Sequence, residues 1–178
     1  RAKVPERRAL PELVRKRGNR NVLLLDGCVQ PGLAPEINHA LERLLERLGI
    51  GVERAPQAGC CGALPHHLSD SERSRVMARR NIDAWYPRIE AGAEAVVVTA
   101  SGCGAHVRDY VHILADDTDY AARARGIRTR LRDAVEVIGQ AAPDTLALRP
   151  RTARIAVHTP CTLQHALQLN GAIETLLT

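Results

Sequence analysis

The sequence predicts an α/β fold in which a parallel sheet of about four strands carries helices on both faces. Short apolar runs of strand length alternate with longer segments whose apolar residues recur at helical spacing. This alternation is typical of a parallel sheet covered by helices. The chain also has 178 residues, which is enough to bury a core in one domain or in two small halves.

The first three predicted strands are an apolar run at residues 22–25, a short strand at about residues 51–54 and an apolar run at residues 95–99. A helix between the first two begins at Pro35, because proline is favoured in a first turn, and ends before Gly49. Ser69 and Glu72 match a capping box and predict a helix that reaches about Glu90. In these two helices we expect nine side chains to face the core: Ile37, Leu41, Leu44, Leu45, Leu48, Val76, Met77, Trp85 and Ile89.

The second half of the chain continues the alternation. A helix is predicted from about residue 105 to residue 114, and Asp117 with Thr118 caps a short further helix. Apolar residues at helical spacing predict another helix over 127–138. Residues 154–157 form the fourth predicted strand, and the chain is predicted to be helical from Thr162 onward. The inward side chains of these helices are Tyr110, Val111, Leu114, Ile127, Leu131, Ala134, Val135 and Ile138.

The predicted domain organisation has four parts. Residues 1–20 are polar and basic and form an arm, and residues 141–153 form a Pro-containing linker. Residues 21–140 form a first repeat unit. Residues 154–178 begin a second, incomplete unit, because the pattern of strand, turn, Cys and Gln at 23–30 recurs at 155–164.

Charge and composition exclude some classes of protein. The net charge is +5, but basic residues alternate with acidic ones along helices, and only Trp85, Tyr86, Tyr110 and Tyr120 are aromatic. A stacking platform for nucleic acid is therefore absent, and we predict no nucleic-acid partner. Five cysteines are an odd number, which disfavours a disulfide framework and favours metal or redox use in a reducing compartment.

The cysteines carry the main functional signal. Each of four comes shortly after a predicted strand, where the carboxyl ends of parallel strands converge. We call these four the cysteine set: Cys28, Cys60, Cys61 and Cys103. Neighbouring cysteines rarely form a relaxed disulfide, whereas two adjacent thiolates suit a metal or a cluster. The intervals of 31 and 41 residues match neither zinc knuckles nor ferredoxin runs, so the set predicts a site assembled by the tertiary fold that holds zinc or an iron–sulfur cluster.

The order of these motifs resembles the cysteine-rich CCG domain, a family with a lone Cys, a Cys-Cys-Gly sequence and a final Cys-x-x-Cys. The resemblance covers about residues 21–178. It rests on the stretches Gly27–Gln30, Gly59–Leu64, Ala100–Gly104 and His158–His165. Within the family, these stretches are most similar to those of glycolate oxidase iron–sulfur subunits. Related lactate, glycerol-3-phosphate and heterodisulfide oxidoreductases are the alternative.

The resemblance implies a Rossmann-like repeat and an electron-transfer function. The chain is then part of an oxidoreductase complex, in which a flavoprotein subunit oxidises glycolate and electrons pass toward quinone. The cysteine set would hold an iron–sulfur cluster, expected to be [4Fe-4S], with zinc as the alternative occupant. No residue of this fragment is expected to be catalytic. The implied location is cytoplasmic, peripherally at the inner membrane.

One position departs from the family pattern, because Ala100 stands where the first Cys of Cys-x-x-Cys is expected. Four thiol ligands remain, with Cys161 as an auxiliary ligand or a buried, unliganded thiol. His66 and His67 are expected in an exposed loop, and His158 and His165 are expected to be structural. A vicinal thiol pair acting in disulfide exchange and a structural zinc module remain alternatives. The incomplete second unit predicts self-association through Ile173, Leu176 and Leu177.

Overall fold

The computed structural model describes residues 20–141 and 154–177. The predicted arm at 1–20 and the predicted linker at 141–153 therefore lie almost wholly outside the described residues. The division into a first and a second repeat unit stays a prediction.

The core of the structure is a parallel sheet of four strands in the order β2-β1-β3-β4, which confirms the predicted fold class. The strands are β1 (Arg20–Leu24), β2 (Ile50–Arg54), β3 (Val96–Val98) and β4 (Leu131–Asp133). Leu23 and Leu24 of β1 lie beside Val96 and Val97 of β3. All carboxyl ends consequently lie along one edge of the sheet.

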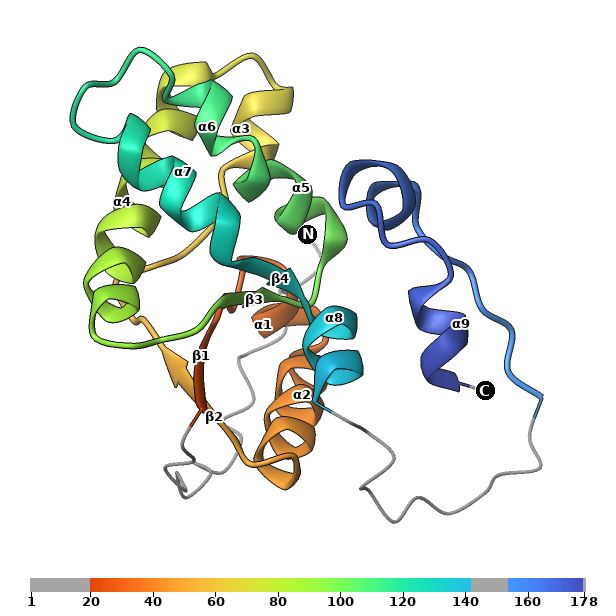
Figure 1. Cartoon of the computed structure of the whole chain (residues 1–178). Coiled ribbons are helices and arrows are strands. Elements are labelled where there is room, and N and C mark those ends of the chain that lie inside the picture. Colours follow the sequence, from red (N-terminus) through yellow and green to blue (C-terminus); the bar gives the residue numbers. More distant parts are fainter. Residues whose placement is uncertain (1–19, 142–153, 178) are drawn as a thin grey trace.

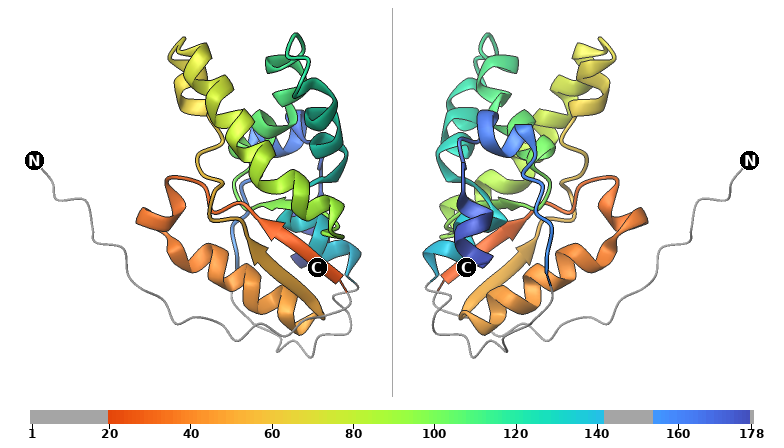
Figure 2. Two further views of the ribbon diagram at one scale, coloured as in Figure 1. Left: turned by 90° about the vertical axis from the view of Figure 1, so that its left-hand side faces the viewer. Right: turned by 90° about the vertical axis from the view of Figure 1, so that its right-hand side faces the viewer.

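Apolar side chains of each central strand alternate between two cores, as expected for a strand that is buried on both faces. Leu23, Val96 and Val98 join one core with apolar residues of α4 and α7. Val22, Leu24 and Val97 join the other core with residues of α2 and α8. Figure 1 shows these two helix pairs on opposite sides of the sheet, and the side views of Figure 2 agree.

The helices follow the strands in a regular order. Between β1 and β3 lie α1 (Gln30–Leu33), α2 (Pro35–Arg47), α3 (Ala63–His67) and α4 (Ser71–Glu90). After β3 come α5 (Ser101–Arg108), α6 (Tyr110–Ile113), α7 (Ala121–Arg130) and α8 (Ala134–Gln140). The C-terminal segment contains a π-helical turn, η2 (Thr162–Ala166), and α9 (Ala172–Leu177).

The fourth strand is not where the sequence predicted it. Residues 154–157 are exposed and form no strand. The position beside β3 in the sheet is instead occupied by β4. β4 interrupts the helix predicted over 127–138. The Asp133 carboxylate accepts a hydrogen bond from the Val135 amide (3.0 Å), and Glu136 accepts one from the Asp133 amide (2.8 Å). This capping box starts a new helix, which periodicity alone does not reveal.

Other predicted details are also corrected. Asp70, rather than Ser69, caps α4, since its carboxylate accepts from the Arg73 amide at 3.2 Å. The helix predicted to start at residue 105 starts at Ser101 and breaks at Asp109. The helix predicted from Thr162 is a single π-turn followed by α9. Ile37 and Val76 are 44% and 54% exposed, because each lies on the solvent side of its helix.

The C-terminal segment packs along α5 and α8 (Figure 1). The Ser101 and Thr162 hydroxyls lie 2.7 Å apart, and Arg108 donates to the Ala166 carbonyl at 3.1 Å. Within the described ranges, no helix has the length and apolar character needed to cross a bilayer.

Candidate functional site

The cysteine set lies at the carboxyl edge of the sheet. Cys28 follows β1, the Cys60–Cys61 pair follows β2, and Cys103 lies in the first turns of α5 after β3. From β1 the chain continues to α2 on one face, whereas from β3 it continues toward α7 on the other. Such a switch point between adjacent strands is where open α/β sheets bind ligands.

The four thiols form a continuous chain of side-chain interactions, although they come from three distant segments. Cys28 interacts with Cys60, Cys60 with Cys61, and Cys61 with Cys103. Cys61 is 3% exposed, Cys60 and Cys103 are half-buried, and Cys28 is exposed. The tertiary fold therefore brings together the four cysteines that the sequence selected.

The thiols differ in acidity. Partial desolvation of the thiol and the neighbouring Cys60 thiol raise the pKa of Cys28 to about 11. The hydrogen bond with Cys103 and then burial raise the pKa of Cys61, and the same hydrogen bond lowers the pKa of Cys103. Of these two thiols, Cys103 therefore carries a negative charge more readily, with the Cys61 thiol donating to it. Binding of a metal or cluster would have to displace the protons of the other thiols.

The backbone of the Cys-Cys pair is held from behind by two buried polar side chains, Asn81 of α4 and Tyr110 of α6, both 0% exposed. The Asn81 amide donates to the Cys60 carbonyl (3.0 Å) and the Tyr110 hydroxyl donates to the Cys61 carbonyl (2.6 Å). Asn81 also accepts from the Gly59 amide (2.9 Å) and donates to the Tyr110 oxygen (2.9 Å). Three consecutive residues are therefore fixed by one network.

Gly62 completes the turn after the pair. Its φ is +92° and a Cβ there would lie 3.2 Å from the Ser74 carbonyl oxygen, so glycine suits the position for two reasons. Behind this turn the buried Ser74 hydroxyl lies 3.1 Å from Nε2 of His106. Burial, with a smaller contribution from His66, lowers the pKa of His106 to about 4. His106 is therefore neutral at physiological pH.

A second polar network holds the loop that carries Cys28. The Thr99 hydroxyl, just after β3, lies 2.6 Å from the Asn38 oxygen and 2.9 Å from the Gln30 oxygen. Asn38 donates to the Asp26 carbonyl at 3.3 Å. Arg54, at the end of β2, pairs with the Asp26 carboxylate. These bonds link the ends of three strands, although the loop itself stays at the surface.

Cys161 is exposed, so the expectation of a buried thiol at this position is wrong, and Cys161 takes no part in the thiol chain. Its neighbour Thr162 bonds to Ser101, so the segment lies beside the start of α5. His66 and His67 are exposed, as expected, but they lie in α3 rather than in a loop. His158 and His165 are also exposed.

Sequence reasoning missed Asn81, Asn38, Thr99 and Arg54, and it treated Tyr110 only as a core residue. One signal was available for Asn81, which stands between Ala78, Ile82 and Trp85 on the buried face of α4. A buried polar residue on an apolar stripe needs a hydrogen-bond partner. The partners themselves lie about 20 to 30 residues away in the chain and are not encoded locally.

The donor chemistry of the site is that of soft and borderline metals, since it consists of four thiols. A single zinc ion would require all four sulfurs about 2.3 Å from one point. Among residues 20–141 and 154–177, no group of three or more His, Cys, Asp or Glu side chains is arranged to hold a metal ion. Four cysteine thiols are also the usual protein ligands of an iron–sulfur cluster.

Comparisons with known proteins agree with this reading of the site. Residues 22–108 match the model of the CCG cysteine-rich domain family. The chain is 50% identical over 161 residues to the glycolate oxidase iron-sulfur subunit of Escherichia coli (strain K12), covering 90% of this chain and 39% of that protein.

Two further relatives are more distant. The chain is 29% identical to a probable glycolate oxidase iron-sulfur subunit of Bacillus subtilis (strain 168), with 89% of this chain and 34% of that protein covered. It is 26% identical to lactate utilization protein A of an Exiguobacterium species, with coverages of 88% and 63%. The chain thus spans 39% of the first relative and 34% of the second. No solved structure matches the chain.

Proposed function

This chain carries a CCG cysteine-rich domain, and we propose that it is the part of a glycolate oxidase iron–sulfur subunit that holds one cluster for electron transfer. The observation that carries the proposal is the continuous chain of four thiols at the carboxyl edge of the sheet. The similarity to the Escherichia coli subunit supports the choice of complex. A related lactate or glycerol-3-phosphate oxidoreductase is the second candidate, favoured by the more distant relatives.

In this proposal the cysteine set supplies all four protein ligands of a [4Fe-4S] cluster. When bound, the cluster accepts and passes on single electrons. Cys61 and Cys103 bind from the buried side and Cys28 from the exposed side. Asn81 and Tyr110 orient the Cys60–Cys61 backbone by their hydrogen bonds. Water is excluded from the Cys61 half of the site, because Cys61 is 3% exposed and belongs to the apolar core.

The remaining chemistry belongs to other subunits in this proposal. A flavoprotein partner oxidises glycolate to glyoxylate, and the electrons continue toward quinone at the membrane. None of the residues of this chain is assigned as a catalytic acid or base. A cytoplasmic location at the inner face of the inner membrane completes the proposal, since a set of ligand thiols suits a reducing compartment.

The proposal is tested by measuring iron, acid-labile sulfide and zinc in the anaerobically purified chain, together with its visible absorption. We expect about four irons and four sulfides per chain. Cys60→Ser and Cys61→Ser should each lose most of this iron. Cys161→Ser is the matched control and should keep it, because Cys161 lies outside the thiol chain.

Other outcomes would contradict the proposal. Stoichiometric zinc without iron would indicate a structural module. Titratable thiols with no metal, in a chain purified without oxygen, would indicate thiol–disulfide chemistry. Unchanged iron in both the Cys60 and Cys61 variants would show that the cluster lies elsewhere.

A further inference from the structure

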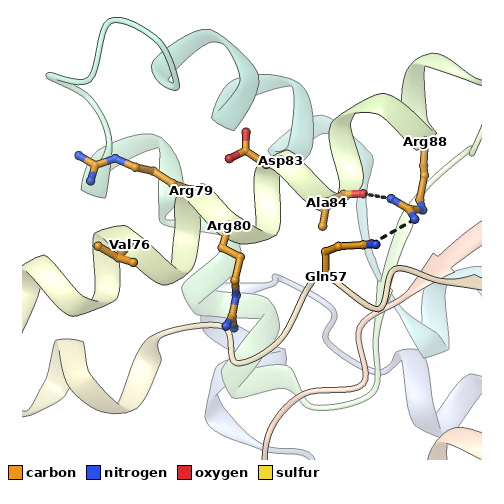
Figure 3. Close-up of a pocket in the computed structure, with 7 residues that line it drawn as sticks. All are labelled: Gln57, Val76, Arg79, Arg80, Asp83, Ala84 and Arg88. Carbon is orange, nitrogen blue, oxygen red and sulfur yellow. Dashed lines mark hydrogen bonds between the residues drawn. The ribbon is translucent and has the colours of Figure 1, made fainter.

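Arg80 of α4 lies directly against the residue that precedes the Cys-Cys pair. A Cβ at Gly59 would overlap Nη2 of Arg80 and lie 3.0 Å from its Cζ. The guanidinium can occupy this position only because residue 59 has no side chain. Figure 3 shows Arg80 extending from α4 toward the loop that follows Gln57. A full positive charge therefore lies one residue from the first ligand of the pair.

The charge of Arg80 is not compensated by a neighbour. Arg80 lines a cavity of about 470 Å³ with two other arginines, Arg79 and Arg88 (Figure 3). Arg79 pairs with Asp117 at 2.8 Å, and Arg88 pairs with Glu53 at 2.8 Å. Among the described residues, Arg80 itself has neither an ion pair nor a hydrogen bond.

The one acidic residue of this cavity is also engaged. Asp83 accepts from the Tyr120 hydroxyl at 2.8 Å and pairs with Arg123 at 3.4 Å. In the described part of the chain, Arg80 is therefore the arginine of this cavity that has no acidic partner, and its side chain is the one that touches Gly59. Cys60 directly follows Gly59 in the chain and would carry a thiolate in the ligated site.

We propose that Arg80 sets the reduction potential of the cysteine site by providing an uncompensated positive charge beside Cys60. This inference rests on the proposed function. A site of four thiolates and a cluster carries net negative charge, and reduction adds one more. A nearby cation stabilises the reduced form more than the oxidised form, so it raises the potential. Because Arg80 is exposed, salt should weaken the effect.

The test is a redox titration of the anaerobically purified, cluster-bearing chain, monitored by visible absorption. Arg80→Gln should shift the midpoint potential to more negative values. We expect about a tenfold lower ratio of reduced to oxidised cluster at a given potential, which is about 59 mV for one electron. The difference from the wild type should shrink as ionic strength is raised. Arg80→Lys keeps the charge and should restore most of the potential.

Two further variants separate charge from structure. Gly59→Ala keeps Arg80 but displaces its guanidinium, so it should shift the potential in the same direction by a smaller amount. Arg47→Gln removes an equally exposed arginine at the end of α2, near the amino ends of the strands, and should leave the potential unchanged.

The outcomes distinguish this inference from the function on which it rests. A wild-type chain without iron and sulfide overturns the proposed function and this inference together. A cluster-bearing chain in which Arg80→Gln and the wild type share one potential overturns the role of Arg80 alone. An equal shift in Arg47→Gln would also overturn it, because the effect would then report net charge rather than position.

Discussion

The two halves of the cysteine site are held in different ways. Cys61 lies in the apolar core and Cys103 packs against it, and the buried Asn81–Tyr110 network holds the backbone of the Cys60–Cys61 pair. Cys28 is exposed, in a loop held by half-buried polar side chains and an ion pair. The buried half is held in place by core packing and hydrogen bonds, whereas the exposed half leaves the site open to solvent. This difference gives an incoming group a route of entry without disturbing the core.

The largest effect on stability should come from removing the hydrogen bonds of Asn81 in the buried half. Asn81→Ala deprives the Gly59 amide and the Cys60 carbonyl of their buried partner, and each unsatisfied group costs about 1–3 kcal/mol. We expect a loss of about 3 kcal/mol in the free energy of unfolding of the metal-free chain, measured in urea. Asp83→Ala, an exposed change two residues further along α4, should lose less than about 1 kcal/mol. Equal losses would show that the Asn81 network contributes no more to stability than an exposed residue of the same helix.

The buried half should also make stability depend on pH, through His106. The pKa of His106 is lowered to about 4 in the folded chain, against about 6.5 when unfolded. Between these values the unfolded state binds a proton that the folded state does not, so acidification destabilises the fold. Below about pH 4 both states are protonated and the loss levels off.

Urea denaturation of the metal-free chain at intervals from pH 7.5 to pH 4 measures this dependence. His106→Gln keeps a polar group beside Ser74 and removes the titration, so its stability should fall less steeply over that range. His66, His67, Asp109, Tyr110 and Ser74 surround the imidazole and are unchanged in the comparison. Identical slopes for the two proteins would contradict the assignment to His106.

The smallest effect should come from the exposed half. Cys28→Ser replaces an exposed thiol, and such surface changes usually alter stability by less than about 0.5 kcal/mol. Cys61→Ser places a hydroxyl at a position that is 3% exposed, which should cost about 1–3 kcal/mol. Thermal unfolding of the two metal-free variants measures the difference. A Cys28 variant as unstable as the Cys61 variant would mean that both halves support the fold.

Several structural elements could be predicted from the sequence alone. The apolar runs at 22–25 and 95–99 correspond to β1 and β3, because a strand buried on both faces has a continuous apolar sequence. The short strand predicted at 51–54 corresponds to β2. The boundaries of α2 and α4 were close, since proline, glycine and capping residues act locally. β4 was missed because Leu131–Asp133 continues the helical spacing of its neighbours, and its strand conformation depends on pairing with β3.

The sequence by itself determined the candidate site, because each segment of the cysteine set follows a strand and parallel strands end on one edge. Only the tertiary structure decided which thiols are buried, which side chains hold the Cys-Cys backbone and which cation lies beside it. Asn81 and Arg80 are adjacent in the chain, yet one reaches into the core and the other against Gly59. Their roles arise from contacts between α4 and a loop more than 20 residues away, and such contacts leave no local pattern in the sequence.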